Sequence, residues 1–495
     1  MKRIAIVGGG ISGLTAAFEL EREKRRRAPL EYVLFESSAR FGGVIQTERV
    51  DGCVIEAGPD SFLTEKPWAA DLCCEVGLGD QLIGSNDAER KTYILLKGRL
   101  VPLPDGLQFM VPARLASAFF SPLFSWRTKA RIVREWFYRP GSGGSESTVA
   151  EFVERHYGRE MVERVADPLL TGVYGGSADE LSVKSVLPRF LEMEAKHGSL
   201  GRAMVASRRE LAEPRAAGQP GAPPPQRAKT GRVGDPGAVP TLFTSLRSGM
   251  EEMVNALLAR IPEASRRSNV SVEAVRAESG KWLAVSGGRT EEFEAVVLAI
   301  PAYAAAELLA GSSAELAGEL NAIRYSSSVT VILSYDKHVR ASLPAGFGFL
   351  IPRGENRRVR AATFLHNKFP DRAPEDRALI RCFLGGTRDE EILQASNEEI
   401  LALVRRELQE ILGITAEPLL VRVFKWNHAM AQYGIGHGAR VERIRELLDG
   451  MPALALAGNA YGGIGVPDCA RSGSEAARKV LADMAIASPA NQSAM

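Results

Sequence analysis

Cysteine, histidine and long apolar runs are scarce in this chain. Its 495 residues include five cysteines and six histidines, and neither type has the spacing of a metal site. No stretch of about 18 residues is free of polar side chains, so we expect no membrane-spanning helix. The 62 basic and 60 acidic residues nearly cancel, which gives no reason to expect a nucleic-acid partner. These absences argue against a disulfide scaffold, a metal enzyme and a nucleic-acid-binding protein, and they favour a reducing cytoplasm.

The composition is that of an ordinary globular protein. Hydrophobic residues make up 45% and charged residues 25% of the chain, which are typical values for folded domains. A chain of this length exceeds one compact core, so we expect two or three domains that interleave along the sequence.

The first forty residues have the pattern of strand, glycine turn, helix and strand. Strands are predicted over residues 3–7 and 32–35, with a helix over residues 11–22 between them. Gly8-x-Gly10-x-x-Gly13 forms the turn, and Glu36 ends the second strand. Glycines let backbone N–H groups and the helix N-terminus meet a pyrophosphate, and the acid can accept from a ribose hydroxyl. The pattern therefore predicts a dinucleotide site, with a plain glycine turn as the alternative.

Two further segments indicate which dinucleotide is bound. Arg40 and the pair Gly42-Gly43 follow the acid, where an extended FAD needs more phosphate and ribitol contacts than NAD does. Near the C-terminus, residues 458–468 join a strand to the last helix, for which Asp468 is a candidate N-cap. A helix N-terminus aimed at the isoalloxazine ring would stabilise negative charge on the reduced flavin. We therefore predict FAD, with both ends of the chain meeting on it.

The remaining sequence predicts a helical region and a second sheet. Capping boxes are predicted at Thr148 with Glu151, at Ser248 with Glu251, and at Ser396 with Glu399. The apolar run 118–126 fits either lipid contact or a buried junction between helices, and the Pro-rich residues 213–240 are predicted to be a mobile loop. Strands are predicted over residues 270–272, 282–285, 295–299, 329–334, 361–366, 378–384 and 453–457.

These patterns predict an α/β (α+β) fold with three interleaved parts. A Rossmann-like FAD-binding domain would comprise residues 1–88, 243–300 and 425–486. A substrate-binding domain with a mixed sheet would comprise residues 89–111, 197–242 and 301–424. Residues 112–196 would form a helical subdomain, which is the candidate for contact with a membrane.

Four motifs give the sequence a family resemblance. They are Glu56-Ala-Gly-Pro-Asp-Ser61, Asp167-Pro-Leu-Leu-Thr-Gly-Val-Tyr-Gly-Gly176, Ala431-Gln-Tyr433 with Gly436-His437, and Gly462-x-Ile-Gly-Val-Pro-Asp-Cys469. With them the sequence resembles the oxygen-dependent porphyrinogen oxidases, which belong to the monoamine-oxidase-like flavoproteins. Val44 stands where many amine oxidases have Arg, which fits the porphyrinogen oxidases better. Ala431 replaces a usual Pro, which puts the local geometry of that loop in doubt.

The resemblance implies a set of FAD contacts and a smaller set of substrate contacts. The implied FAD contacts are Gly8, Gly9, Gly10, Ile11, Ser12, Gly13, Glu36, Arg40, Gly42, Gly43, Val44, Gly58, Pro59, Asp60, Ser61, Val272, Trp426, Ile464, Gly465 and Val466. The implied substrate contacts are Leu169, Gly172, Phe383 and, for a propionate, Lys91. Arg189, Arg360 and Lys368 are further candidate anchors for propionates. No catalytic side chain is implied, and His366, His428 and His437 are interpreted as structural.

The implied activity is oxidation of a porphyrinogen to the porphyrin in haem biosynthesis. Three two-electron hydride transfers to FAD would be followed by reoxidation with O2, which gives H2O2. Coproporphyrinogen III is favoured over protoporphyrinogen IX as the substrate. A cytoplasmic enzyme is expected, with peripheral contact at the inner face of the membrane and handover of product to the next haem-pathway enzyme as open possibilities. The alternatives are an amine oxidase, a desaturase or a non-catalytic regulator on the same fold.

Overall fold

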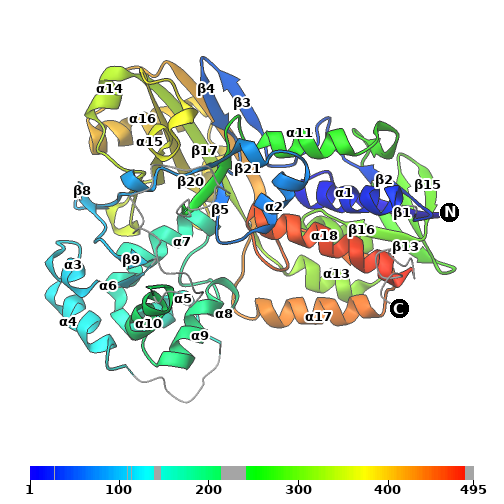
Figure 1. The fold of residues 1–495 in the computed structure, drawn as a ribbon, viewed down its shortest axis with the longest axis horizontal. Helices are drawn as coiled ribbons and strands as arrows, with labels where there is room; N and C mark the ends of the chain where they lie inside the picture. The colour runs from blue at the N-terminus through cyan, green and yellow to red at the C-terminus, as the bar shows by residue number, and fades with distance from the viewer. Residues whose placement is uncertain (27, 109, 113, 139–145, 213–240, 485–495) are drawn as a thin grey trace, which may run out of the picture.

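A computed structural model describes residues 1–26, 28–108, 110–112, 114–138, 146–212 and 241–484. The loop predicted over residues 213–240 and the end of the chain lie outside the described residues. Figure 1 shows a parallel sheet with helices α1 (Ile11–Arg25) and α18 (Val466–Asp483) at one end of the molecule. A second sheet and a group of helices lie at the other end.

The first sheet has five parallel strands in the order β12-β2-β1-β16-β22. Their bounds are Arg266–Arg267, Leu30–Phe35, Lys2–Val7, Ala295–Leu298 and Leu454–Leu456. Ile4 and Ile6 of β1 belong to the core that the sheet shares with α1 and α18, whereas Ala5 and Val7 belong to the core on the other face. Burial on both faces explains why residues 4–7 of β1 and all of β16 are apolar. The predicted Rossmann-like fold is confirmed.

The second sheet has seven strands and is mixed. Its order is β21-β17-β20-β19-β18-β7-β8, and β18 pairs with β7 in parallel while the other pairs are antiparallel. The bounds are Leu420–Ala431, Tyr325–Asp336, Arg377–Gly385, Val359–Phe364, Gly348–Leu350, Thr92–Leu96 and Arg99–Pro102. Helix α16 (Asn397–Leu412) shares a core with this sheet through Ile400, Val404 and Leu408, and the capping box predicted at Ser396 is confirmed.

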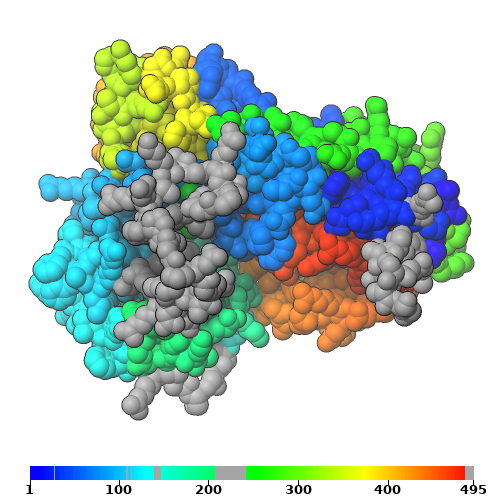
Figure 2. Space-filling model, in the orientation of Figure 1, coloured from blue at the N-terminus to red at the C-terminus, as the bar shows by residue number. Residues whose placement is uncertain are grey.

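The group of helices between residues 115 and 212 forms the end of the molecule that lies opposite the chain's N-terminus (Figures 1 and 2). They are α3 (Leu115–Phe120), α4 (Trp126–Glu135), α5 (Val149–Tyr157), α6 (Arg159–Met161), α7 (Asp167–Tyr174), α8 (Val183–Val186), α9 (Pro188–His197) and α10 (Leu200–Ala212). The capping box of Thr148 and Glu151 opens α5 as predicted. Helix α10 packs on α9, so the helices continue beyond the predicted end at residue 196.

The structure contains further strands and helices outside the two large sheets and the helical group. They are β3 (Thr47–Val50), β4 (Cys53–Glu56), β5 (Phe62–Leu63), α2 (Trp68–Glu75), β6 (Leu82–Gly84), β9 (Leu107–Gln108), β10 (Val111–Pro112), β11 (Phe243–Leu246), α11 (Glu251–Arg260), β13 (Ala274–Glu278), β14 (Lys281–Ser286), β15 (Arg289–Phe293), α12 (Ala302–Leu309), α13 (Ala314–Asn321), α14 (Lys337–Ser342), α15 (Leu365–Lys368) and α17 (His437–Asp449).

The cap predicted for α11 is wrong, because a residue from another part of the chain supplies it. The helix begins at Glu251, and Ser248 makes no capping hydrogen bond to it. Instead the Glu251 backbone N–H donates to Thr47 Oγ1 at 3.0 Å, and the Glu251 carboxylate accepts from the Thr47 N–H at 3.3 Å. This reciprocal pair has the chemistry of a capping box, but it joins β3 to α11.

Two further local predictions are wrong. Residues 270–272 form no strand, because the Val270 N–H donates to the Glu36 carbonyl at 2.9 Å and the strand β13 begins only at Ala274. Asp468 is not the N-cap of α18, because this helix begins at Val466. The Asp468 carboxylate accepts a hydrogen bond from the Gly465 N–H at 3.3 Å, and Asp468 itself lies in the first turn of the helix.

Candidate functional site

The turn after β1 requires glycine at Gly8 and Gly13. Gly8 has a φ of +104°, and a Cβ on Gly13 would lie 1.9 Å from the Gly8 carbonyl oxygen. A Cβ on Gly10, by contrast, would meet no atom within 4 Å. The outer side of the turn is therefore open, as a site that must admit a pyrophosphate requires.

The N-terminus of α1 has no side-chain cap. Gly10 is the N-cap residue, and no side chain accepts from the first N–H groups of this 15-residue helix. Uncapped N–H groups and the helix dipole together attract an anion. The donors at Ile11, Ser12 and Gly13 thus fit a phosphate group.

Glu36 is fixed beside this turn. Its Oε2 accepts from the Gly9 N–H at 2.8 Å, and its Oε1 accepts from the Ser38 N–H at 2.8 Å and from Ser38 Oγ at 2.7 Å. These bonds hold the carboxylate at the end of β2, where a ribose would lie on the dinucleotide pattern.

The second glycine pair packs directly on the first turn. The Gly42 N–H donates to the Gly9 carbonyl at 2.7 Å, and a Cβ on Gly43 would lie 3.3 Å from the Gly10 Cα. Arg40 donates to the carbonyl oxygens of Gly43 and Ile45, so its guanidinium stabilises its own loop.

The loop 57–61 lies between the second glycine pair and the mixed sheet. A Cβ on Gly58 would lie 1.9 Å from the Val44 carbonyl oxygen, and Trp426 Nε1 on β21 donates to the Ala57 carbonyl at 2.9 Å. Pro59 precedes Asp60, whose carboxylate accepts from Ser61 Oγ at 2.7 Å. The loop therefore links the two sheets.

The end of the chain reaches the same region through α18. A Cβ on Gly473 would lie 2.0 Å from the Ser12 carbonyl oxygen, and Ser12 Oγ donates to the Cys469 carbonyl at 2.9 Å. Ile464 and Gly465 lead into α18, which begins at Val466. The two ends of the chain thus meet.

Val272 lies on the segment that follows the hydrogen bond between Val270 and Glu36. The open turn, the uncapped helix and the fixed acid fit the dinucleotide part of a flavin cofactor.

The residues predicted to contact substrate come from three elements. Leu169 is half-buried and Gly172 is exposed on α7, where a Cβ on Gly172 would lie 3.8 Å from Leu350 Cδ2 on β18. Lys91 is exposed just before β7, and in the described part of the chain no carboxylate lies within ion-pair distance of its amino group. Phe383 on β20 has the Arg381 guanidinium 4.8 Å from its ring centre.

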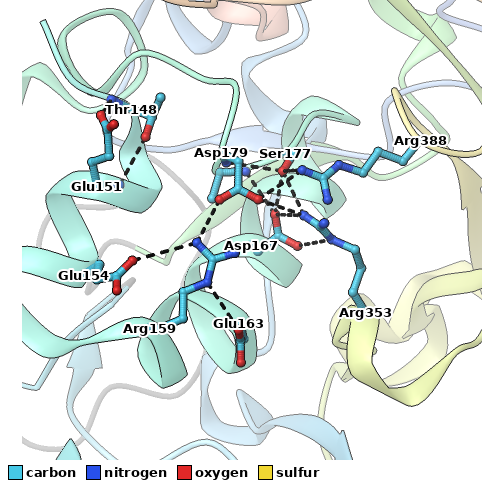
Figure 3. A network of polar contacts seen from close by, with 11 residues as sticks. Thr148, Glu151, Glu154, Arg159, Glu163, Asp167, Ser177, Asp179, Arg353 and Arg388 are labelled. Atoms are coloured by element: carbon cyan, nitrogen blue, oxygen red, sulfur yellow. Dashed lines mark hydrogen bonds and ion pairs between the residues drawn. The ribbon is translucent and has the colours of Figure 1, made fainter.

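Ion pairs attach α7 to the mixed sheet (Figure 3). Arg353 donates through Nε to Asp167 Oδ2 at 3.1 Å, and Ser177 Oγ donates to Asp167 Oδ1 at 3.1 Å. Arg388 and Arg353 both reach Asp179, at 3.0 and 3.3 Å. A five-residue π-helical stretch, Val162–Ala166, directly precedes α7, and such irregular turns are frequent at functional sites.

Sequence reasoning missed a buried charged cluster behind the loop 57–61. Lys368 Nζ donates to both Asp60 oxygens at 3.1 and 3.2 Å, and the Arg372 guanidinium lies 3.0 Å from Glu56 Oε1. The sequence indicates Lys368 as a candidate propionate anchor, but its side chain is buried. Arg381, which interrupts an otherwise apolar strand, was the signal that could have revealed the cluster.

Two of the candidate histidines are neutral structural groups. Burial lowers the pKa of His366 and that of His437 to about 4 in each case. The His366 ring is bound to the Leu379 N–H at 3.1 Å, and the His437 ring stacks on Tyr433 with 4.0 Å between the centres. These surroundings agree with the structural interpretation.

Comparisons with known proteins give the family. The pattern of the family described as flavin containing amine oxidoreductase matches residues 11–481, and the chain belongs to this family. Coproporphyrinogen III oxidase of Bacillus subtilis (strain 168) is 33% identical to it over 483 residues, which are 97% of this chain and 98% of that protein. The enzyme of the same name from Propionibacterium freudenreichii is 30% identical, over 98% of this chain and 91% of that protein.

Solved structures agree with this assignment. A crystal structure described as "Putative protoporphyrinogen oxidase" from Exiguobacterium sp. 255-15 superposes with a TM-score of 0.83 at 28% identity, and the match covers 98% of this chain and 99% of that one. A reduced UDP-galactopyranose mutase shares the fold, with a TM-score of 0.69 at 15% identity over 99% and 98% of the two chains. The resemblance to the porphyrinogen oxidases is confirmed, and the chain is a flavin-dependent oxidoreductase.

Two features are absent from the described residues. No helix among them is long and apolar enough to cross a bilayer, and no group of three or more His, Cys, Asp or Glu side chains among them could hold a metal ion.

Proposed function

We propose that this protein oxidises coproporphyrinogen III to coproporphyrin III with FAD as its cofactor. The observation that carries the proposal is the similarity, along nearly the whole chain, to relatives named coproporphyrinogen III oxidase, together with one region that fits a flavin dinucleotide. When bound, FAD would accept two electrons in each of three cycles and pass them to O2, which becomes H2O2.

The residues of the chain would bind and orient this cofactor. The N–H groups at Ile11 to Gly13 would hold the pyrophosphate, and Glu36 would accept from a ribose hydroxyl. Residues 42–44, 58–61 and 464–466 would surround the flavin end, with Trp426 beside them. Val272 would lie near the adenine. No side chain is assigned as an acid or a base.

Substrate preference would depend on cationic anchors. Coproporphyrinogen III carries four propionates and protoporphyrinogen IX carries two, so the copro-oxidising site needs more positive charge. Lys91 is exposed and its amino group has no carboxylate partner among the described residues, which supports it as one such anchor. Leu169, Gly172 and Phe383 would contact the apolar macrocycle.

The test is aerobic turnover with both porphyrinogens, read by porphyrin fluorescence after the flavin spectrum has been recorded. We expect faster turnover with coproporphyrinogen III. The Lys91→Met variant should raise KM for this substrate about tenfold, which corresponds to the loss of one charge-assisted hydrogen bond. Lys184→Met, at another exposed lysine, is the matched control. A yellow protein that oxidises neither porphyrinogen would refute the proposal.

We also propose that the surface of α3 and α4 contacts an anionic membrane. Phe120, Trp126 and Phe137 are 81%, 71% and 77% exposed, and Phe119 and Val133 lie beside a hollow of about 200 Å³ on the same helices. Arg127, Lys129, Arg131 and Arg134 of α4 form no ion pair among the described residues. Exposed aromatic rings next to cations without a carboxylate partner favour the interface of an anionic bilayer.

Sedimentation with vesicles tests this contact. The protein should bind vesicles of phosphatidylcholine with phosphatidylglycerol more strongly than vesicles of phosphatidylcholine alone. Phe120→Ser combined with Trp126→Ser should reduce the bound fraction at least tenfold, because two large apolar groups are lost. Leu419→Ser, at a residue that is 53% exposed elsewhere, should change nothing. Equal binding by the double variant and the control would contradict the proposal.

A further inference from the structure

The charged cluster behind the loop 57–61 carries more cations than carboxylates. Its cations are Lys368, Arg372 and Arg381, and its carboxylates are Glu56 and Asp60. Arg372 and Glu56 are each 1% exposed, Arg381 is 4% exposed and Lys368 is 8% exposed. The cluster therefore holds an excess positive charge away from water.

The protonation of the two acids preserves this excess. Burial alone would raise the pKa of Asp60, but Lys368 and Arg381 outweigh burial and hold it below its usual range. Burial raises the pKa of Glu56, and Arg372 only partly opposes this effect. Asp60 is thus a carboxylate that neutralises one cation, and Glu56 neutralises at most one more. Burial lowers the pKa of Lys368, and Asp60 opposes this effect. With Lys368 protonated beside Asp60, at least one positive charge stays uncompensated.

Arg381 is the cation that contacts a residue of each predicted binding site. Its guanidinium donates to the Gly58 carbonyl oxygen of the proposed flavin loop, and it lies 4.8 Å from the ring centre of Phe383. Its Nη1 is 3.9 Å from Asp60 Oδ2, while its buried Nε has no hydrogen-bond partner. A buried charge with an unsatisfied N–H is costly and is commonly retained where it has a functional use.

A negative charge that appears nearby would compensate this excess, and two sources are chemically reasonable. A substrate propionate would need direct contact, but Arg381 and Lys368 are buried and already bound to Asp60. The reduced flavin needs no contact, because the field of a buried charge acts across a loop and is only weakly screened by salt. The burial of the cluster therefore favours the flavin.

We infer that Arg381, held in place by Asp60, makes the bound flavin easier to reduce by placing positive charge behind the loop 57–61. The inference rests on the proposed binding of FAD. It assigns Arg381 a positioning and electrostatic role, distinct from contact with the porphyrinogen.

The test uses two variants for which the inference predicts opposite changes in the flavin midpoint potential. Arg381→Met removes one positive charge, and Asp60→Asn removes one negative charge at nearly constant shape. In the FAD-bound protein, we expect Arg381→Met to disfavour flavin reduction about tenfold, which is about 30 mV for two electrons. Asp60→Asn should favour reduction by a similar factor. Arg381→Lys, which keeps the charge, should stay close to the wild type.

The matched control is Arg422→Met. Arg422 on β21 also joins the mixed sheet to another element, through an ion pair with Glu48 on β3, but this pair is about one-third exposed. Its loss should leave the potential unchanged. The potential of the wild type should also vary little with ionic strength, because the Arg381 side chain is buried.

The outcomes separate this inference from the proposed function. Unchanged potentials in yellow Arg381→Met and Asp60→Asn proteins, or shifts of both in the same direction, would overturn the inference. A tenfold rise in KM for coproporphyrinogen III at unchanged potential would also overturn it, because the cluster would then act on the substrate. A yellow wild type that oxidises no porphyrinogen refutes only the proposed substrate, whereas a colourless wild type refutes both. If Arg381→Met does not fold, Asp60→Asn and Arg381→Lys still decide the question.

Discussion

Gly473 in α18 allows this helix to approach α1 more closely than any side chain would permit. An alanine Cβ at this position would lie 2.0 Å from the Ser12 carbonyl oxygen and 3.0 Å from the Ser12 Cα. Ordinary contacts of this kind are about 3.4 Å or longer, so α18 must move away from α1 by more than an ångström. Because both partners are backbone, no side-chain rotation can relieve the clash.

We therefore predict that Gly473→Ala destabilises the protein and weakens its binding of FAD. Overpacking of this kind costs about 1–3 kcal/mol, and alanine in a helix returns about 1 kcal/mol, so the net loss is up to about 2 kcal/mol. The displacement would also separate the turn at Gly10 from Ile464, which come from opposite ends of the chain. A cofactor that contacts both should then bind more weakly.

Gly318→Ala is the matched control, because it makes the same chemical change in a helix without a clash. Gly318 is exposed on α13, and its Cβ would meet no atom within 4 Å. This variant should gain up to about 1 kcal/mol. The assay is thermal unfolding with and without added FAD, together with the flavin absorbance retained on purification. If Gly473→Ala retained FAD and unfolded at the same temperature as Gly318→Ala, the reasoning from close backbone approach would be refuted.

Two further predictions concern charged groups away from the proposed flavin site. The buried His156 ring lies 3.2 Å from both Glu135 and Glu194; burial lowers its pKa, but the two acids outweigh burial and raise it. The contribution of His156 to stability is therefore full below the unfolded pKa of about 6.5 and is lost as the pH rises through the folded pKa. The denaturant midpoint of the wild type should fall at alkaline pH. The midpoint of His156→Gln should not show this fall. Arg353→Met removes a half-exposed partner of the buried Asp167 and should lower the free energy of unfolding by about 1 kcal/mol. In steady-state kinetics it should raise KM and leave kcat nearly unchanged. An unchanged KM would count against α7 as part of the substrate site.

The sequence predicts local features well where neighbouring residues determine them. The turn at Gly8 to Gly13 and the capping boxes at Thr148 and Ser396 depend on contacts within a few residues, and all three were expected from their patterns. The cap on α11 could not be predicted in this way, because Thr47 supplies it from about two hundred positions earlier in the chain. No periodicity or propensity contains that information.

The charged cluster shows the same limitation at the site. Asp60 belongs to a motif that can be recognised, whereas Lys368 at the end of α15 and Arg381 on β20 lie about three hundred residues away. Lys368 alone has the pattern of a surface residue or a propionate anchor, and Arg381 shows only that an apolar strand contains a charge. Only the fold brings them against the loop 57–61, where burial turns ordinary charges into a source of strong local field.

The same cluster bears on the expectation that the dipole of α18 stabilises the reduced flavin. Asp468 lies in the first turn of this helix, where its carboxylate opposes the positive end of the dipole. Lys66 donates to both Asp468 oxygens at 2.9 and 2.7 Å and neutralises that carboxylate, so the positive end of the dipole remains. The flavin would then receive positive charge from this helix end and from the excess charge at Arg381. Lys66→Met should therefore shift the flavin potential in the same direction as Arg381→Met, since it leaves the Asp468 charge uncompensated.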